Sequence, residues 1–344
     1  MSISASNSAP AADGFRMPAE WVGHSRCWMG WPCRPETWDG AGFEAAKSAY
    51  AEVAKAIAAF EPVAMVCNPA DVAEVSLICG TGVTVLPLDL SDSWMRDIGP
   101  SFLVDGKGGL AGVHWRFNAW GENYPDYAAD AEVGRKVLEH LGLPLYAAPL
   151  VLEGGAIHVD GEGTVLTTEQ CLLNPNRNPH LDRGQIEELL KDHLGANTVV
   201  WLGEGYQDDE TDGHVDEIAF FVRPGVVAAI VTDDPGDSNF KAFQDNLDRL
   251  KAARDARGRE FEVIPLPQPK RRDHNGVRLT LSYTNLYLAN GGVVMPAFED
   301  FADDEAFRIL RRCFPERQVV QVPALDIVRG GGGIHCITQQ QPEP

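Results

Sequence analysis

The sequence of 344 residues has no Cys-x-x-Cys pair and an odd number of cysteines, at positions 27, 33, 67, 79, 171, 313 and 336. Paired cysteines usually mark zinc sites and disulfide frameworks, so this pattern argues against both. Three of the cysteines lie within apolar runs, where a cysteine commonly serves as a small buried hydrophobic side chain. Free thiols are typical of a reducing compartment, and we therefore expect a cytoplasmic protein.

Long apolar runs and an excess of basic residues are also missing. The longest apolar run, 226–231, is far shorter than the roughly 20 residues that cross a bilayer. Lys and Arg number 29 against 50 Asp and Glu, which gives a net charge of −21. We therefore expect neither nucleic acid nor a membrane as a partner, whereas a small cationic substrate is compatible with this charge.

The first residues lack the basic and apolar segments of a signal peptide. They predict a disordered leader over residues 1–12, followed by a single catalytic domain over residues 13–344. The chain is long enough for one large core, and its 44% hydrophobic and 23% charged residues are ordinary for a globular protein. The oligomeric state is left open, with a homo-oligomer among the alternatives.

One pattern of elements recurs along the chain. Paired apolar runs with the period of β-strands, joined by turns that contain glycine, predict hairpins near 102–115, 156–168, 215–232 and 280–296. Helices are predicted after them at 130–141, 182–194, 239–257 and 303–314, and then strands at 145–151, 198–202, 261–266 and 319–323. The unit is therefore ββαβ, and it repeats about every 55–65 residues, in the range of repeat architectures.

A fifth unit begins at residue 334 but ends after one strand, and its missing parts are found at the N-terminus. There the sequence predicts a strand at 26–31, a helix at 43–60 and a strand at 63–67, followed by one more helix and strand. The fold class that follows is an α/β ring of five ββαβ units, closed by pairing of the N- and C-terminal segments. A doubly wound sheet is the rival architecture, and the hairpins before each helix argue against it.

Polar residues collect at one phase of this repeat, at the start of each unit's first strand. They are Asp97, Glu153, His214, Asp216 and Cys336. Equivalent positions of a ring point to the same axis, so we expect these five side chains to converge. Taken singly, each has an ordinary structural interpretation, such as a turn or a buried thiol. Their shared phase favours a site.

The chemistry of these residues suggests covalent catalysis. Cys336 follows four glycines, whose bare backbone permits close approach, and we interpret it as a nucleophile. His335 is its neighbour and should face the other way, so His214 is the better base, with Glu153 to orient it. His214 and Asp216 are two residues apart and are expected to share a face of a strand. Paired carboxylates suit a guanidinium, which they bind through two N–H groups.

Several long motifs carry a resemblance to a known family. WMRDIGP, LEGGAIHVDGEGTVLTTEQCLLNPNRNPHL, DETDGHVDEIAFFVRPG, YTNLYLANGGVVMP and GGGGIHCITQQQP resemble the agmatine deiminases, over residues 15 to 342. These enzymes belong to the guanidine-modifying superfamily, whose fold is the five-bladed α/β-propeller, or pentein. The resemblance therefore implies the same ring that the repeat predicts.

The resemblance also implies roles for individual residues. Cys336 would form the covalent amidino intermediate, His214 would act as general acid and base with Glu153 beside it, and Asp97 and Asp216 would hold the guanidinium. Further substrate contacts are implied for Trp94, Glu210 and Gly333. The family usually has Asn where this chain has Gly333 and Asn where it has Glu217.

The function that follows is hydrolysis of agmatine to N-carbamoylputrescine and ammonia, a step of putrescine and polyamine biosynthesis, with neither metal nor cofactor. The alternatives within the superfamily are an arginine deiminase, a peptidyl-arginine deiminase and an amidinotransferase. An α-carboxylate would need a basic partner, and Arg96 and Arg116 are the main basic residues among the acidic segments. The non-enzyme alternative is a propeller-like interaction scaffold.

Overall fold

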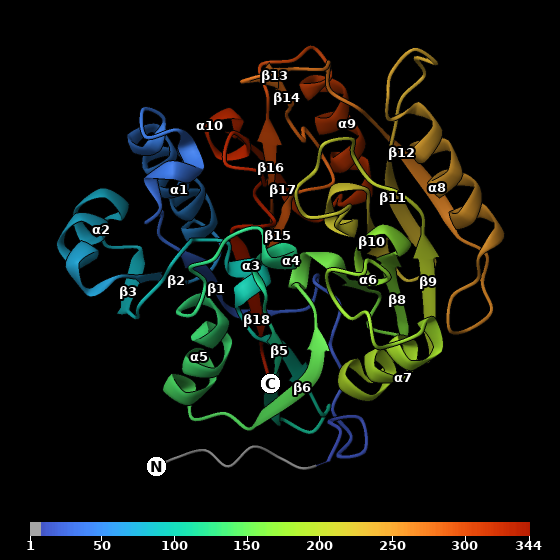
Figure 1. The fold of residues 1–344 in the computed structure, drawn as a ribbon, viewed down its shortest axis with the longest axis horizontal. Helices are drawn as coiled ribbons and strands as arrows, with labels where there is room; N and C mark the ends of the chain where they lie inside the picture. The colour runs from blue at the N-terminus through green and yellow to red at the C-terminus, as the bar shows by residue number, and fades with distance from the viewer. Residues whose placement is uncertain (1–7) are drawn as a thin grey trace.

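The computed structural model describes residues 8–344, which form a mixed α/β fold (Figure 1). Within these residues there are five sheets of three or four strands and one two-stranded sheet. In strand order the five larger sheets are β18 (Thr338–Pro342), β1 (His24–Gly30), β2 (Val63–Cys67) and β3 (Val83–Pro87); β4 (Ser101–Val104), β5 (Leu110–Arg116) and β6 (Leu145–Val151); β7 (His158–Val159), β8 (Thr164–Thr168) and β9 (Thr198–Leu202); β10 (Ala219–Arg223), β11 (Val226–Val231) and β12 (Glu262–Pro267); and β15 (Tyr287–Ala289), β16 (Gly292–Ala297) and β17 (Gln318–Pro323). The small sheet pairs β13 (Asp273–His274) with β14 (Val277–Arg278).

Each of the five larger sheets pairs its first two strands antiparallel and its next pair parallel. The predicted succession of hairpin, helix and strand is thus confirmed for the described residues. The first sheet takes β18 from the C-terminus, which runs antiparallel to β1 with Trp28 opposite Gln339 and Met29 opposite Thr338. The C-terminal strand therefore completes the N-terminal sheet, as the sequence predicted.

The helices connect the strands, and the long ones lie toward the outside of the molecule with the strands between them (Figure 1). The helices are α1 (Phe43–Ala58), α2 (Val72–Cys79), α3 (Met95–Ile98), α4 (Ala119–Glu122), α5 (Val133–Leu141), α6 (Glu169–Leu172), α7 (Arg183–Leu194), α8 (Phe240–Ala252), α9 (Asp303–Cys313) and α10 (Leu325–Val328). Short 3₁₀ turns cover Pro35–Trp38, Pro69–Asp71, Asp130–Glu132, Gly154–Ala156 and Val215–Glu217.

The helices bury the faces that their sequences predict. In α7, Ile186, Leu190 and Leu194 are buried and Leu189 is half-buried, as expected of apolar residues spaced three and four apart. The helix begins at a capping box, in which Asp182 accepts from the amide of Gln185 and the Gln185 side chain accepts from the amide of Asp182. Local capping and burial therefore act together to fix this helix.

Three predicted boundaries are wrong. The hairpins placed at 215–232 and 280–296 begin only at β10 and β15, and the helix placed at 239–257 ends with α8 at Ala252. Before β15, the hydroxyls of Ser282 and Thr284 donate to the carbonyls of Glu217 and Asp216, so this segment is held by side chains and not by a strand ladder. After α8, Asp255 accepts from two following amides and forms a turn.

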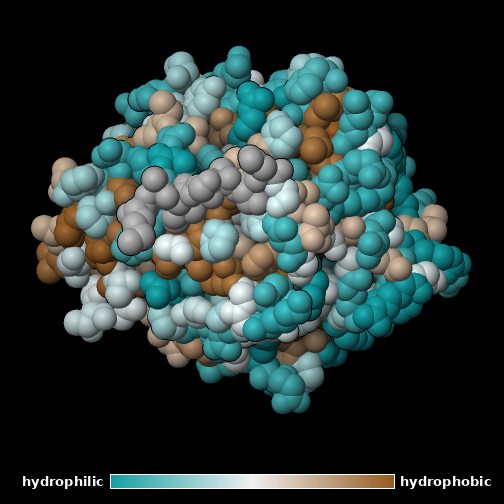
Figure 2. All heavy atoms as spheres, turned by 90° about the horizontal axis from the view of Figure 1, so that it is seen from below, coloured by the Kyte–Doolittle hydropathy of each residue, from teal (hydrophilic) through white to brown (hydrophobic). Residues whose placement is uncertain are grey.

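The predicted leader over residues 1–12 lies partly outside the described residues, which begin at residue 8. In its described part, the amide of Ala11 donates to the carbonyl of Asp192. Across residues 8–344, every helix is too short or too polar to span a bilayer. The face of the molecule in Figure 2 is mostly hydrophilic with scattered hydrophobic patches, in keeping with the many charged residues.

Candidate active site

The five predicted catalytic residues lie in or beside short turns that come before the first strand of a sheet. Asp97 lies in α3 before β4, and Glu153 precedes the 3₁₀ turn before β7. His214 precedes the 3₁₀ turn before β10, which contains Asp216, and Cys336 lies in the turn before β18. The prediction that His214 and Asp216 share the face of a strand is therefore wrong, because their segment forms a helical turn. The shared phase of all five residues is nevertheless present in the structure.

Gly155 marks the point where three of these side chains meet. A Cβ atom at this position would lie 2.6 Å from Nδ1 of His214, 3.0 Å from Oδ2 of Asp216 and 3.0 Å from Oδ1 of Asp97. Its amide donates to Oδ1 of Asp97 over 2.9 Å. Only glycine leaves room for three charged groups around one point of the backbone. The turn containing Gly155 thus holds the base and both carboxylates together.

Cys336 joins this group through Asp216. Its Sγ lies 3.6 Å from Oδ2 of Asp216, 3.7 Å from Oε1 of Glu217 and 3.1 Å from Nδ2 of Asn285. The residue is only 4% exposed. Burial raises the pKa of the Cys336 thiol well above its ordinary value, and the carboxylates of Asp216, Glu217 and Asp97 raise it further. A bound cation would offset that negative charge and favour the thiolate.

His214 lies between two carboxylates. Its Nδ1 is 3.9 Å from Oδ1 of Asp97, and its Nε2 is 3.7 Å from Oε2 of Glu153. Burial disfavours the charged ring, but the Asp97 and Glu153 carboxylates outweigh it and raise the pKa of His214 well above its ordinary value. A charged imidazole in this place can donate a proton to a leaving group.

Glu153 is fixed from the side away from His214. Arg177 donates through Nε to Oε1 of Glu153 over 2.7 Å, and its Nη1 contacts Asp212 at 2.9 Å. Burial would raise the pKa of Glu153, but Arg177 and His214 outweigh it and hold that pKa below its ordinary value. Glu153 therefore stays ionised beside the imidazole. Sequence reasoning missed Arg177, although it stands in the quoted motif NPNRNPHL.

Asp97 accepts two hydrogen bonds, one for each oxygen. Gly155 donates its amide to Oδ1, and Trp120 donates Nε1–H to Oδ2, both over 2.9 Å. Burial raises the pKa of Asp97. His214 acts against this rise, whereas the Asp216 and Glu153 carboxylates add to it. The carboxylate is thus held in one orientation at the edge of the site.

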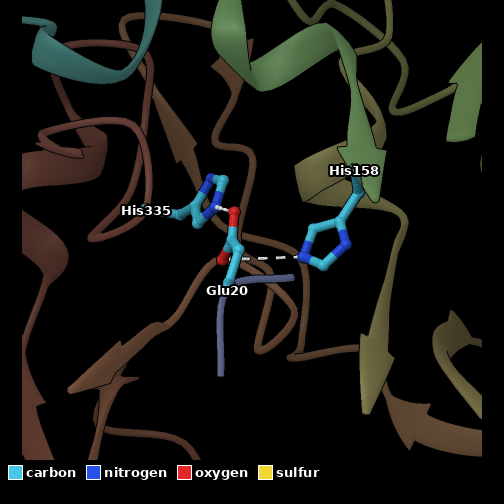
Figure 3. A group of neighbouring side chains, drawn as sticks. All are labelled: Glu20, His158 and His335. Atoms are coloured by element: carbon cyan, nitrogen blue, oxygen red, sulfur yellow. Dashed lines mark hydrogen bonds and ion pairs between the residues drawn. The ribbon is translucent and has the colours of Figure 1, made fainter. Parts of the chain in front are cut away.

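Behind Asp216 lies a buried network that Figure 3 shows in part. His335 contacts Oδ2 of Asp216 through Nδ1 over 2.8 Å and Oε1 of Glu20 through Nε2 over 2.9 Å. Glu20 in turn lies 3.3 Å from Nη1 of Arg96 and 3.6 Å from Nε2 of His158. Both ring nitrogens of His335 are therefore occupied by carboxylates, and its Asp216 partner oxygen is the one that also lies near the Cys336 sulfur.

Glu20→Gln should destabilise the fold by about 3–5 kcal/mol at pH 7, because it removes one partner of a buried ionic network. Burial would raise the pKa of Glu20, but His335, Arg96 and His158 outweigh it and hold that pKa well below 4.5. A lowered pKa stabilises the fold above pH 4.5, and this stabilisation is lost as pH falls through the folded-state pKa. Urea unfolding should therefore show a gap between the two proteins that narrows below pH 4.5.

The exposed Glu188→Gln serves as the control, since its side chain is 72% accessible and contacts Lys191 at the surface. It should change the unfolding free energy by no more than about 0.5 kcal/mol. A gap between wild type and Glu20→Gln that is absent at pH 7, or that is unchanged down to pH 3, would contradict the ionic role of Glu20.

The four glycines before His335 each make room for another part of the site. A Cβ at Gly330 would strike the ring of Trp38 at 2.6 Å, and one at Gly331 would strike Oε1 of Glu210 at 2.4 Å. A Cβ at Gly332 would lie 2.7 Å from Trp94 and 3.1 Å from Sγ of Cys336, and one at Gly333 would lie 2.4 Å from Oδ1 of Asn285. The glycine run is therefore a closely packed segment, as the interpretation of close approach requires.

Trp94 and Glu210 lie on the outer side of this run. Trp94 is 4% exposed and stacks on Trp38 with 6.0 Å between the ring centroids. Glu210 keeps contact with solvent and accepts a hydrogen bond from the hydroxyl of Tyr124 over 2.9 Å. Partial desolvation by nearby protein raises the pKa of Glu210 to about 7, against the effect of Tyr124.

A cleft of 320 Å³ opens at Glu210. Its acidic lining residues are Glu36, Asp39, Asp208 and Glu210, and Gly330 and Gly331 form part of its wall. The two arginines of the lining are paired, Arg278 with Asp237 and Arg329 with Asp326. The cleft therefore offers net negative charge beside the glycine run. A separate groove of 800 Å³, lined by residues such as Arg223 and Cys313, contains none of the predicted site residues.

Four buried polar atoms of the site have no hydrogen-bonding partner among residues 8–344. They are Nδ1 and Nε2 of His214, Oδ1 of Asp216 and Oε2 of Glu217. Buried polar atoms are nearly always paired in folded proteins, so a cluster of unpaired ones within one segment points to a ligand. A small cation with several N–H groups would satisfy the carboxylate oxygens.

Groups of acidic, histidine and cysteine side chains also lie close enough to hold a metal ion, and one of them is Glu20, His158 and His335 (Figure 3). Glu20 and His335 already contact each other, and Arg96 and Asp216 complete their contacts. This is the pattern of an ionic network that needs no ion. That the reaction proceeds with neither metal nor cofactor remains a prediction.

Comparison with known proteins now identifies the family. The family model of the Porphyromonas-type peptidyl-arginine deiminases matches residues 16–342, and the chain belongs to this family. Two curated relatives are the agmatine deiminase of Stutzerimonas stutzeri strain A1501, 48% identical over 98% of each chain, and that of Ectopseudomonas mendocina strain ymp, 46% identical over 97% of each chain. The predicted family resemblance is thereby confirmed.

A solved structure gives the same result for the fold. The structure of the Enterococcus faecalis agmatine deiminase, described as catalysing its reaction, superposes with a TM-score of 0.96. It is 38% identical and covers 99% of this chain and all of its own. The mixed α/β fold of the chain is therefore that of this enzyme.

Proposed function

We propose that the protein is an agmatine deiminase, a hydrolase that converts agmatine to N-carbamoylputrescine and ammonia and thereby contributes to putrescine and polyamine biosynthesis. The agmatine deiminases named above support this proposal, since they match the chain from end to end. The single observation that carries it is the convergence of the Cys336 sulfur, 3.6 Å from Oδ2 of Asp216, with the carboxylates of Asp97 and Asp216, which each lie 3.0 Å from one point beside Gly155. A guanidinium carbon placed there would face a nucleophile and two anionic groups.

In the first half-reaction, the guanidinium lies between Asp97 and Asp216, which accept its N–H groups. The Cys336 thiolate attacks the guanidinium carbon and forms a C–S bond. His214 then gives its proton to the departing nitrogen, the C–N bond breaks and ammonia leaves. A planar amidino group remains on the sulfur. The raised pKa of His214 keeps the ring protonated for this step.

In the second half-reaction, His214 is neutral and accepts a proton from water. The resulting hydroxide attacks the amidino carbon, the C–S bond breaks and the hydroxyl proton passes to solvent. The neutral ureido product then leaves, with Cys336 returned to its thiolate. Glu153 stabilises the imidazolium in both halves because it lies 3.7 Å from Nε2. The electrons of the new C–O bond replace those that return to sulfur, so the cycle needs no oxidant or reductant.

The charge of the cleft favours a substrate with a second cation over one with an α-carboxylate. Glu210 and its acidic neighbours face the place where the far end of the substrate would lie, beyond Trp94 and the glycine run. Arg96, the basic residue named from the sequence as a partner for a carboxylate, is buried and bonded to Glu20 and Gln340. A primary amine at the end of the chain suits Glu210 better.

We further propose that the five larger sheets are the blades of one closed pentein propeller, and that residues 13–344 act as one catalytic domain. The common strand order of the sheets and the pairing of β18 with β1 support this arrangement. In this geometry the turns before each blade's first strand share one end of the axis. The cytoplasmic location and the absence of nucleic-acid and membrane partners remain predictions, and the oligomeric state stays open.

Ammonia release from agmatine, arginine and an arginyl peptide, measured side by side, tests the function. We expect kcat/KM for agmatine to exceed that for the other two by at least about 100-fold, since an α-carboxylate or peptide would meet the acidic cleft unpaired. Preference for arginine or for the peptide would overturn the proposal in favour of another deiminase. Ammonia-free transfer to an added amine would indicate an amidinotransferase, and no reaction with any guanidine would favour a scaffold.

A further inference from the structure

We propose that Asn285 is a further catalytic residue, whose side-chain amide donates a hydrogen bond to the Cys336 sulfur and fixes that sulfur for attack. For the reaction this rests on the proposed function, whereas the effect on the thiol itself does not. Nδ2 of Asn285 lies 3.1 Å from Sγ, and the residue is 1% exposed. A neutral donor at this distance favours the thiolate over the thiol and limits the directions in which it can point.

All hydrogen-bonding positions of this amide are used. Oδ1 accepts from the backbone N–H of His335 over 2.8 Å and of Cys336 over 3.4 Å. Nδ2 donates to Oε1 of Glu217 over 2.9 Å as well as to Sγ. Two backbone donors on one side and a carboxylate on the other leave a single orientation of the amide. Its N–H group therefore faces the sulfur because the surrounding contacts allow no other arrangement.

The position of Asn285 in the repeat supports the same inference. The other site residues lie in the turns before β4, β7, β10 and β18, while the turn before β15 has no role so far. Asn285 lies in that turn, two residues before Tyr287, where β15 begins. It thus occupies in its sheet the place that Asp97, His214 and Cys336 occupy in theirs. All five turns then contribute to one site.

Glu217 and Gly333 both bear on the position of Asn285. Glu217 accepts from its Nδ2, and a Cβ at position 333 would lie 2.4 Å from its Oδ1. A residue larger than glycine at 333 would displace the amide from the backbone of the nucleophile. Glu217 and Gly333 therefore both help to hold Asn285 in place. Glu217 does so as a hydrogen-bond acceptor, and Gly333 does so by leaving space for the amide.

The site makes this donor important because carboxyl groups are close to the sulfur. Asp216 and Glu217 present carboxyl oxygens at 3.6 and 3.7 Å from Sγ. Burial raises the pKa of Glu217 well above its ordinary value and Asp216 raises it further, so the repulsion that opposes ionisation of the thiol comes mainly from Asp216. The N–H group of Asn285 acts against that repulsion. An isosteric change that replaces the donor by an acceptor should therefore have a large effect on the sulfur and a small effect on shape.

Asn285→Asp makes this change, since Oδ1 can still accept from the backbone while an oxygen replaces the N–H group that faces Sγ. The rate constant for alkylation of Cys336 by iodoacetamide at pH 8, followed on the Cys336 peptide by mass spectrometry, should fall at least tenfold. The kcat for agmatine should fall at least about 100-fold, as for loss of one positioned donor in an active site. The KM should change less than kcat, because the amide contacts the nucleophile and not the substrate cleft.

Asn290→Asp is the matched control. Asn290 is also a bonded asparagine of the fifth sheet, where it accepts from the amide of His24 and donates to its carbonyl, but it has no contact with Cys336. It should leave both the alkylation rate and kcat within about twofold of wild type. If Asn285→Asp does not fold, Asn285→Ala replaces it with the same expected losses.

Unchanged alkylation and unchanged kcat in a folded Asn285 variant would overturn the proposal, as would an equal loss in Asn290→Asp. The measurement of the alkylation rate requires no substrate. If wild type releases no ammonia from agmatine, the proposed function fails, and the alkylation rates alone still decide the role of Asn285.

Discussion

Cys336→Ala should abolish ammonia release from agmatine, with a loss of at least about 10⁴-fold in kcat, while agmatine still binds. The sulfur supplies the bond to the guanidinium carbon and lies 3.6 Å from Oδ2 of Asp216, whereas Cys171 lies beside Glu153, with its Sγ 3.9 Å from Oε2. Binding should persist because the two carboxylates remain. Titration calorimetry would measure the Kd for agmatine, and an ammonia assay would measure turnover.

Cys313→Ala provides the control for this prediction. Cys313 is a buried free thiol at the end of α9, away from the site. It should lose no more than about 1–2 kcal/mol of stability and keep its kcat. Residual turnover of Cys336→Ala near the wild-type rate would show that the sulfur forms no bond with the substrate. Loss of turnover in Cys313→Ala at full folding would show that the assay does not report on Cys336.

Asp97→Asn should lower kcat/KM for agmatine by about 10²–10³-fold, the range expected for loss of one charged contact in a desolvated site. The asparagine has one oxygen for two donors, so either Gly155 or Trp120 would also lose its acceptor. The guanidinium then meets a neutral amide in place of a carboxylate. Steady-state kinetics over a range of agmatine concentrations would measure the effect.

The pH dependence of kcat/KM provides a second test of the role of Asp97. Burial raises the pKa of this group, so protonation of Asp97 should lower wild-type kcat/KM as pH falls through that raised value. This acid limb should weaken in Asp97→Asn, which has no charge to lose. The exposed Asp304→Asn, at the start of α9, should behave as wild type. A wild-type kcat/KM in Asp97→Asn would remove Asp97 from the site.

Much of the fold follows from periodicity in the sequence. Apolar alternation and glycine turns predicted the hairpins, and the spacing of Ile186, Leu190 and Leu194 predicted the buried face of α7. The return of β18 to β1 could be predicted because a unit was left incomplete at each end of the chain. The predicted boundaries were wrong where side chains such as Ser282 bond to a neighbouring turn. Such contacts join distant parts of the chain, so they leave no periodic pattern in the local sequence.

The sequence predicted where the site residues fall within the repeat, but it did not predict the contacts that support them. Asp97, Glu153, His214, Asp216 and Cys336 share one position of the repeat, and the structure brings them together. Trp120 could not be found in this way, because it reaches Asp97 through a backbone with positive φ at Ala119, Trp120 and Glu122. Non-glycine residues seldom adopt that conformation, and no sequence pattern predicts it.

Asn285 is a different case, since the signal for it was present. It stands in the motif YTNLY and in the same phase of the repeat as the other site residues. An asparagine has no charge and titrates nowhere near neutral pH, so a search for acids, bases and nucleophiles passes over it. Arg177 and Glu20 were missed for a related reason, because their roles depend on burial, which composition does not reveal.

The central claim is a covalent bond between the Cys336 sulfur and the guanidinium carbon during turnover. Rapid acid quenching of wild type with saturating agmatine, followed by peptide mass spectrometry, tests it directly. The account predicts an adduct on the Cys336 peptide with the mass of agmatine less ammonia, absent from Cys336→Ala. Sustained ammonia release with no adduct on that peptide, or with the adduct on another cysteine, would contradict it.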